Sequence, residues 1–188
     1  MRVIAGSAKG IQLQAVPGSG TRPISDRVKE ALFNIIGDAI IDAHVLDLFA
    51  GTGSVGIEAL SRGAAASLFV EKQAKAVATI RANLQRTRLQ TRAHVVKGDV
   101  FRFLEGEPQP FDLIYVAPPQ YRGLWRKTLL SLEANPGWVG PGSLVVVQIF
   151  PKELDTLTLT SLSLTDQRSY GSTLLCFYEY TLGNTPDE

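Results

Sequence analysis

The feature that most constrains the fold is a strand, a glycine turn and a helix that follow directly on one another. Residues 45–49 form an apolar strand interrupted only by Asp47, residues 50–53 are an Ala-Gly-Thr-Gly turn, and residues 55–62 have a helical pattern that Gly63 ends. Glycines in such a turn let backbone amides approach a bound ligand closely. The unit predicts a parallel sheet with a ligand at the carboxyl ends of its strands.

The rest of the chain continues the alternation of strand and helix, and its last part predicts a hairpin. The fold class is therefore α/β: a mostly parallel seven-stranded sheet with a C-terminal antiparallel hairpin, preceded by an N-terminal β-hairpin and helix. We expect further strands at residues 67–70, 94–96, 111–116, 142–149, 162–168 and 174–180, helices at 74–87 and 124–132, a hairpin at 1–16, and a helix that Ser25 caps and Gly37 ends.

Length and composition limit the class of protein. A chain of 188 residues with 45% hydrophobic content predicts one domain over residues 1–188, with an N-terminal extension at 1–36 and a core at 37–182. A single cysteine, Cys176, excludes a disulfide framework and fits a reducing compartment. Because no segment has the pattern of a signal peptide or a membrane span, we expect a cytoplasmic protein with no membrane partner.

Three acidic residues stand at or near the ends of predicted strands, where a cofactor would bind. Asp47 precedes the glycine turn, where its charge would repel a pyrophosphate but hold the cationic amino-acid end of S-adenosylmethionine; the alternative is that it caps a turn. Glu71 would accept the ribose hydroxyls of this cofactor or of NAD, or start a helix at the surface. Asp99 would accept the adenine amino group or cap the next helix. The expected cofactor-binding set is Asp47, Ala50, Gly51, Gly53, Glu71, Lys72, Asp99 and Val100.

At Asp47, Glu71 and Asp99 the chain resembles the Rossmann-like class I methyltransferases. From residue 1 to about 180 it also resembles a narrower family, the bacterial 16S ribosomal RNA guanine-N2 methyltransferases. This resemblance implies S-adenosylmethionine as cofactor, a monomer, and transfer of a methyl group to a guanine N2 of 16S rRNA in an assembling small ribosomal subunit. It rests on Met1-Arg-Val-Ile-Ala-Gly6, Thr21-Arg-Pro23, Arg27-Val-Lys-Glu-Ala-Leu-Phe-Asn34, Asp47-Leu-Phe-Ala-Gly-Thr-Gly53, Glu58-Ala-Leu-Ser-Arg-Gly-Ala64 and Tyr170-Gly171-Ser-Thr173.

The catalytic signature of that family, Asp or Asn followed by Pro-Pro and an aromatic residue, is altered in this chain. It reads Ala117-Pro118-Pro119-Gln120-Tyr121. The resemblance implies that a side-chain oxygen and the first proline carbonyl accept hydrogen bonds from the amine, while the aromatic ring stacks on the base. Ala117 removes the side-chain acceptor and leaves the Pro118 carbonyl and the amide of Gln120, while Tyr121 comes one place late.

Two functions of other classes therefore remain open. Ala117 is compatible with a catalytically silent RNA-binding protein that keeps the methyltransferase fold. The glycine turn is also compatible with an NAD-dependent oxidoreductase, which Asp47 and the Pro-Pro sequence disfavour.

The basic residues are distributed unevenly, although the net charge is only +1. Residues 1–102 hold 14 of the 19 basic side chains and 8 of the 18 acidic ones. This permits a basic face for RNA, although solvated helices produce similar asymmetry. His44 and His94 have no cysteine or histidine partner nearby, so we expect structural roles and no metal. The predicted RNA-binding residues are Arg2, Lys9, Arg22 and Arg27.

Overall fold

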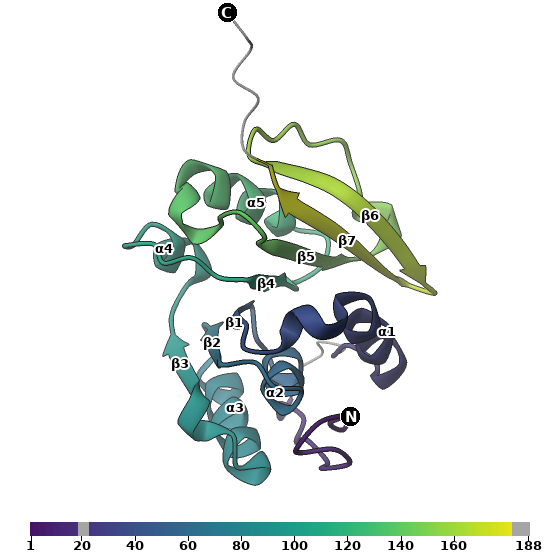
Figure 1. Cartoon of the computed structure of the whole chain (residues 1–188), viewed down its shortest axis with the longest axis vertical. Coiled ribbons are helices and arrows are strands. Elements are labelled where there is room, and N and C mark those ends of the chain that lie inside the picture. Colours follow the sequence, from purple (N-terminus) through teal and green to yellow (C-terminus); the bar gives the residue numbers. More distant parts are fainter. Residues whose placement is uncertain (19–22, 182–188) are drawn as a thin grey trace, which may run out of the picture.

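The computed structural model describes residues 1–18 and 23–181. One seven-stranded sheet has the order β3-β2-β1-β4-β5-β7-β6 (Figure 1). Strands β1 to β5 are parallel, and β7 runs antiparallel to both β5 and β6. This confirms the prediction of a mostly parallel sheet with a C-terminal antiparallel hairpin. The strands are β1 His44–Leu48, β2 Ala66–Glu71, β3 Ala93–Lys97, β4 Leu113–Val116, β5 Leu144–Ile149, β6 Leu162–Tyr170 and β7 Thr173–Tyr180.

Helices cover both faces of the sheet. On one face lie α1, α2 and α3, and on the other α4 and α5. Every predicted helix is present with its ends within about two residues, the uncertainty that assignment of helix ends carries. Among the described residues, none of the helices combines the length and apolar character that crossing a membrane requires. The helices are α1 Asp26–Ile36, α2 Ser54–Ser61, α3 Ala74–Thr87, α4 Val100–Leu104 and α5 Leu124–Ala134.

The alternation of side chains along each strand divides the core into two clusters. Beneath α1, α2 and α3, Val45 packs with Leu32, Ile57 and Phe69. Residues one step along the strands, such as Leu46, join the cluster under α4 and α5. Full burial of a side chain of this size contributes about 1.5–3 kcal/mol, so the two clusters fix which residues of each strand face which helices.

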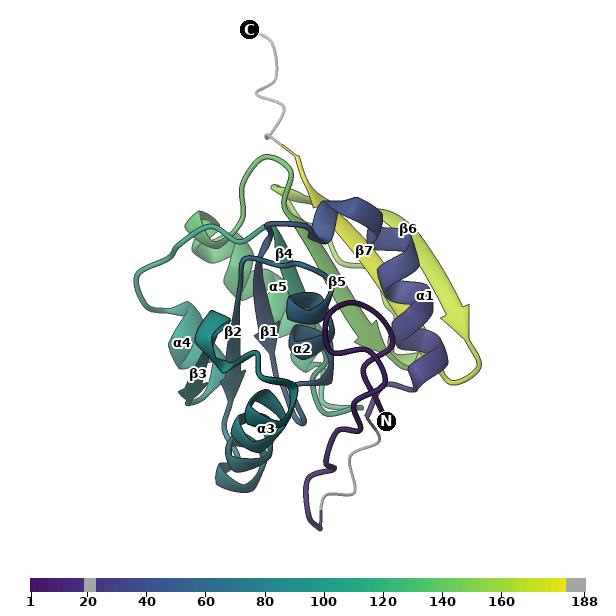
Figure 2. The same ribbon diagram turned by 60° about the horizontal axis from the view of Figure 1, so that its bottom comes forward.

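The predicted N-terminal hairpin is present in a short form. An antiparallel bridge joins Arg2 to Gln12, and on either side of it the Val3 amide donates to the Ile11 carbonyl oxygen and the Leu13 amide to the Met1 carbonyl oxygen. Backbone amides nearer the tip of the hairpin donate to helix α2. Those of Ile4 and Ala5 donate to the Glu58 carboxylate, and that of Ser7 donates to the Ser61 carbonyl oxygen. The hairpin therefore lies beside α2 (Figure 2).

Candidate cofactor and substrate site

The carboxyl ends of the parallel strands bring the predicted cofactor residues to one edge of the sheet. Asp47 is one residue from the end of β1, and Glu71 is the last residue of β2. Tyr115 lies opposite Asp47 on the neighbouring strand β4. This edge is where ligands bind in open α/β sheets, because the loops that follow the strands form a crevice there.

The glycine turn between β1 and α2 has a backbone that glycine adopts most easily. Gly51 and Gly53 have φ angles of 57° and 76°. A Cβ atom on Gly53 would lie 3.2 Å from Ile80 Cγ2, so no side chain fits there without movement. Glu71, which is buried, accepts a hydrogen bond from the Gly51 amide at 2.9 Å and another from the Gln73 amide at 2.8 Å. Glu71 thus holds the turn against the end of β2, and its contact with a ribose stays a prediction.

Asp47 is a buried carboxyl group with one hydrogen-bond partner among the described residues. Only 2% of the residue is exposed, and Oδ2 accepts a hydrogen bond from the Gly56 amide at 3.0 Å, so Asp47 also caps the start of α2. Burial raises the pKa of Asp47 to about 8, and the charge of Glu71 contributes to this rise. No described residue gives Oδ1 a hydrogen bond. A cation placed beside this carboxyl group would be strongly favoured.

Asp99 follows β3 and makes the contacts of a helix cap. Its Oδ1 accepts from the Phe101 and Arg102 amides at 3.0 and 3.4 Å, and its Oδ2 accepts from Lys72 Nζ at 3.2 Å. Desolvation raises the pKa of Asp99, but these hydrogen bonds outweigh it and lower the pKa overall. The capping alternative is therefore present in the structure, and contact with adenine stays a prediction.

The Pro-Pro turn follows β4 and is fixed to the end of β5. The exposed ring of Tyr121 stacks on Phe150, with 5.3 Å between the ring centroids and 17° between the planes. Glu153 accepts from the Tyr121 amide at 2.7 Å and from the Phe150 amide at 3.0 Å. Sequence reasoning missed Phe150 and Glu153. The signal that could have found them is an aromatic residue directly after the strand predicted at 142–149.

Two aromatic residues at this edge have left-handed backbone angles, which side chains rarely adopt. The φ angles are 58° at Phe49 and 57° at Tyr121. Such a conformation costs about 1–3 kcal/mol and is concentrated at functional sites. Gln120 and Pro119 are exposed in the same turn as Tyr121, whereas Pro118 is buried.

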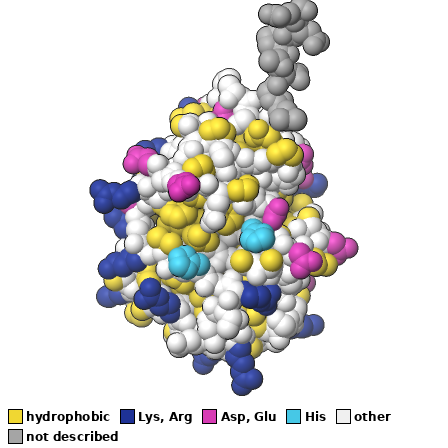
Figure 3. Space-filling model, turned by 60° about the vertical axis from the view of Figure 1, so that its left-hand side comes forward, with side chains coloured by type: hydrophobic (Ala, Val, Ile, Leu, Met, Phe, Trp, Pro, Cys, Tyr) yellow, Lys and Arg dark blue, Asp and Glu magenta, His cyan; other side chains and the backbone are white. Residues whose placement is uncertain are grey.

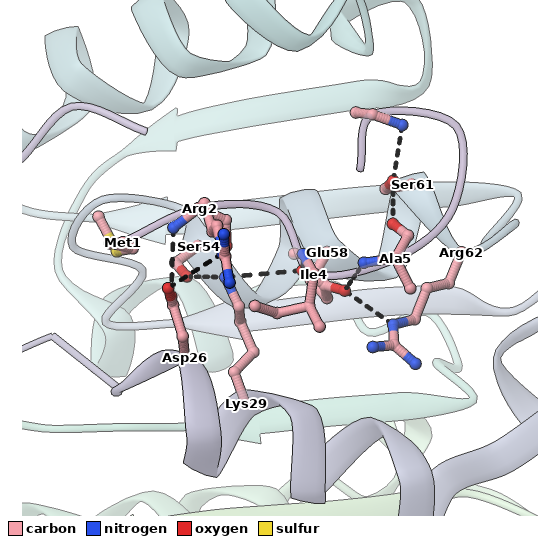
Figure 4. Close-up of polar contacts among 12 residues, drawn as sticks. Met1, Arg2, Ile4, Ala5, Asp26, Lys29, Ser54, Glu58, Ser61 and Arg62 are labelled. Atoms are coloured by element: carbon pink, nitrogen blue, oxygen red, sulfur yellow. Dashed lines mark hydrogen bonds and ion pairs between the residues drawn. The ribbon is translucent and has the colours of Figure 1, made fainter. Parts of the chain in front are cut away.

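A buried polar network joins the N-terminal segment and α1 to α2 (Figure 4). Lys29 Nζ donates to the Arg2 carbonyl oxygen at 2.6 Å and to Ser54 Oγ at 3.0 Å, and it lies 3.6 Å from Glu58 Oε2. Glu58 also accepts from Arg62 Nε at 2.8 Å. Burial lowers the pKa of Lys29, while the charges of Glu58 and Asp26 act against it. Because Ser54 begins α2 directly after the glycine turn, this network fixes the helix that carries the turn.

The predicted RNA-binding residues lie in the N-terminal part of the chain. Lys9 and Arg27 are exposed, and Arg2 is exposed with its guanidinium 3.8 Å from Asp26. Arg22 lies outside the described residues. Lys9 follows Ala8, which donates to Ser61 Oγ of α2 and packs in the cluster under α1, α2 and α3, so this turn lies on the same side of the sheet as α1.

Both histidines lie far along the strands from this site. His44 begins β1, with Nδ1 3.7 Å from Asp112, and His94 is an exposed residue of β3. Figure 3 shows the two histidines on one face with hydrophobic side chains between them. A cleft of about 470 Å³ lies there, at the amino ends of the strands. Within the described ranges, no three His, Cys, Asp or Glu side chains gather as metal ligands do.

The chain is similar to known proteins over almost its whole length. Residues 1–179 match the model of a family described as conserved hypothetical protein 95. YlbH of Bacillus subtilis, provisionally assigned as an rRNA methyltransferase, is 38% identical over 95% of this chain and 98% of its own. Ribosomal RNA small subunit methyltransferase D of Escherichia coli is 38% identical over 79% of this chain and 74% of its own. The solved structure of Escherichia coli yhhF, provisionally assigned as a methyltransferase, superposes with a TM-score of 0.86 at 34% identity, over 96% of this chain and 97% of that one.

Proposed function

The chain belongs to the conserved hypothetical protein 95 family, whose model residues 1–179 match, and we propose that it methylates N2 of a guanine in 16S rRNA. The coarser activity is S-adenosylmethionine-dependent methylation of ribosomal RNA on a Rossmann-like class I methyltransferase fold. The finer proposal adds the guanine N2 atom, the assembling small subunit as substrate, a monomer, and the cytoplasm as location. Asp47 is the observation that carries the methyltransferase activity, since a buried carboxyl group beside a glycine turn fits a cationic cofactor; the finer points rest on the likeness to small subunit methyltransferase D.

The residues at the carboxyl ends of the parallel strands, around the glycine turn, fit S-adenosylmethionine. We propose that Asp47 holds its ammonium group, that Glu71 accepts its ribose hydroxyls, and that Asp99 accepts its adenine amino group. When bound, the cofactor supplies a methyl group, whose bond to sulfur breaks with the electron pair passing to sulfur as the amine lone pair forms the new bond and a proton leaves to water. Ala50, Gly51, Gly53, Lys72 and Val100 complete the set of residues proposed to contact the cofactor.

The Pro-Pro turn positions the base in this proposal. The Pro118 carbonyl oxygen accepts a hydrogen bond from the exocyclic amine, which directs the nitrogen lone pair toward the methyl group. Tyr121, already stacked on Phe150, offers its other ring face to the guanine. Pro119 stiffens the turn, and Gln120 is an exposed amide within reach of solvent and substrate.

Two measurements test this function. Calorimetry should detect binding of S-adenosylmethionine or S-adenosylhomocysteine and no binding of NAD. Incubation with labelled S-adenosylmethionine and small subunits that lack the modification should place the label on a guanine, recovered as N2-methylguanosine after digestion and mass spectrometry. Label on another atom would contradict the N2 assignment, and label in protein-free 16S rRNA but not in subunits would contradict the subunit as substrate.

Ala117 favours one second candidate, an RNA-binding protein that has lost catalysis. Removal of one preorganised hydrogen-bonding group costs about 3–4 kcal/mol of transition-state stabilisation, which would leave a slow enzyme unless another group replaces it. Binding of cofactor and rRNA without transfer at saturating cofactor would favour this candidate. Methyl transfer by the wild-type protein would exclude it.

A further inference from the structure

Ala117, where the family signature has Asp or Asn, lies beside a glutamine that is not part of that signature. We propose that Gln148, held by the hydroxyl of Tyr115, supplies the side-chain acceptor that Ala117 lacks, so that the protein methylates rRNA without the usual Asp or Asn. This inference rests on the proposed function and deepens it at one atom. In this inference Gln148 Oε1 accepts a hydrogen bond from the substrate amine. Tyr115 is a positioning residue.

The register of the sheet places Gln148 beside Ala117. Strands β4 and β5 are parallel neighbours, with Leu113 opposite Leu144 and Val116 opposite Val147. The next step along both strands brings residue 117 opposite residue 148. Neighbouring strands lie about 4.8 Å apart, a distance that a glutamine side chain spans easily.

Both residues also lie on the same face of the sheet. Tyr115 and Ala117 pack with the cluster under α1, α2 and α3, as do Leu144 and Val146 on β5. The residues that alternate with these along each strand, such as Val147 on β5, pack in the cluster on the other face. Because side chains alternate, Gln148 is on the face of Ala117 and of Asp47, which is the side of the glycine turn.

A hydrogen bond fixes the amide of Gln148. The Tyr115 hydroxyl donates to Gln148 Oε1. Tyr115 is 3% exposed, and burial raises its pKa well above 10, so its hydroxyl keeps its proton and donates at neutral pH. A carbonyl oxygen accepts two hydrogen bonds, so one lone pair of Oε1 is left for the substrate amine.

Gln148 is better prepared for this contact than Gln120. Gln120 is exposed, and no described residue hydrogen-bonds its side chain. Ordering a free glutamine costs up to about 2 kcal/mol of rotamer entropy, which Gln148 has already given up on folding because Tyr115 holds it. Asp47 is opposite Tyr115 in the sheet, and the Tyr115 hydroxyl reaches Gln148 two residues further along β5, so Tyr115 lies between the proposed cofactor-binding carboxylate and the proposed acceptor.

The test compares single and double variants on small subunits that lack the modification. Gln148→Ala should lower kcat by on the order of 100-fold, the effect typical of removing one preorganised hydrogen-bonding group. The Kd for S-adenosylhomocysteine and the Kd for rRNA should not change. Adding Ala117→Asn to Gln148→Ala should restore most of kcat, because the introduced asparagine returns the oxygen to its usual place; a residue with a merely structural role would not be rescued in this way. Gln167→Ala, an exposed glutamine on β6, is the matched control and should keep wild-type kcat.

Two further variants keep the test decisive. Gln148→Asn retains the amide but withdraws it by one methylene, and Tyr115→Phe removes only the hydroxyl; each should lower kcat and leave cofactor affinity unchanged. Wild-type kcat in Gln148→Ala would overturn the inference and leave the proposed function intact. If the wild type binds cofactor but transfers no methyl group, both the inference and the proposed function are overturned. If the single variant Ala117→Asn is then active, Gln148 does not replace the missing oxygen in the wild type.

Discussion

Folding favours the protonated form of the Asp47 carboxyl group, whereas binding of a cationic ligand favours the ionised form. Its pKa of about 8 lies above the ordinary value of 3.8, so the folded protein without ligand favours the protonated form. Its contribution to stability is therefore fully present below about pH 4 and is lost as the pH rises toward 8. Holding an ammonium group requires the ionised form, so binding and proton release are linked.

We expect the affinity for S-adenosylhomocysteine to rise with pH between about 5.5 and 7.5, by up to about tenfold per pH unit, because Asp47 must release its proton. Calorimetry in two buffers of different ionisation enthalpy measures both the affinity and the protons released. Asp47→Asn has no proton to release, so it should bind more weakly and without this pH dependence. A wild-type affinity that is flat over this range would count against the assignment.

Lys29 is a buried charged residue whose removal should strongly destabilise the fold. It is fully buried with three oxygen neighbours, and removing it leaves the Glu58 carboxylate buried with one cation fewer. We expect Lys29→Ala to lower the free energy of unfolding by about 3–5 kcal/mol in urea titrations. Glu30→Ala, an exposed neighbour on the same helix, should change it by less than about 0.5 kcal/mol. Equal values for the two variants would show that the network does not stabilise the fold.

Prediction from sequence succeeded in placing residues whose position follows from a single strand. Asp47 and Glu71 could be placed beside the glycine turn because the turn and the strand ends can be recognised from short stretches of sequence. Phe150, Glu153 and Gln148 could not, since their relation to the Pro-Pro turn depends on which strand lies beside β4. Neighbour order and register are set by packing across the whole sheet, which no local pattern records.

At the scale of elements, Glu153 connects the Pro-Pro turn to the end of β5. We expect Glu153→Ala to lower kcat/KM for rRNA about tenfold, because the amides of Tyr121 and Phe150 would no longer have the acceptor that fixes the stacked rings. Cofactor affinity should not change. Steady-state kinetics with subunits and calorimetry with S-adenosylhomocysteine separate the two effects.

The matched control for this variant is Asp155→Ala, which removes an exposed carboxylate two residues further on, paired with Arg126. Its kinetics should equal those of the wild type. If Glu153→Ala also retains wild-type kcat/KM, the turn keeps its shape without Glu153.

The elements themselves were largely predictable, whereas the contact of the N-terminal hairpin with α2 was not. Strands and helices of the core were found because apolar alternation and glycine turns bound each of them. The N-terminal hairpin was predicted, but its packing on α2 was not, because amides near its tip bind a side chain and a carbonyl group more than 50 residues away in sequence. The helix α4 has five residues, so only the capping pattern of Asp99 marked it.

At the scale of the whole molecule, the basic residues of the N-terminal part are the proposed contact with rRNA phosphates. We expect Arg2→Ala with Lys9→Ala to weaken binding of the small subunit and to reduce the slope of log affinity against log salt by about 0.7–0.9 for each phosphate that the protein no longer neutralises. Filter binding over a range of salt concentrations measures this slope. Arg86→Ala on α3, an exposed charge of the same kind, should leave the slope unchanged. An unaltered slope in the double variant would place the RNA on another surface.

The position of α1 has a consequence for the time course of synthesis. Leu32 and Phe33 of this early helix share one buried cluster with Leu175 and Phe177 of β7, the last strand of the described residues. At about 5–20 residues per second, the ribosome needs roughly 7–30 s to reach β7 after it has made α1. Throughout that interval the apolar side of α1 has no complete partner, so a nascent chain of this protein is one that ribosome-associated holding chaperones should recognise by its first helix.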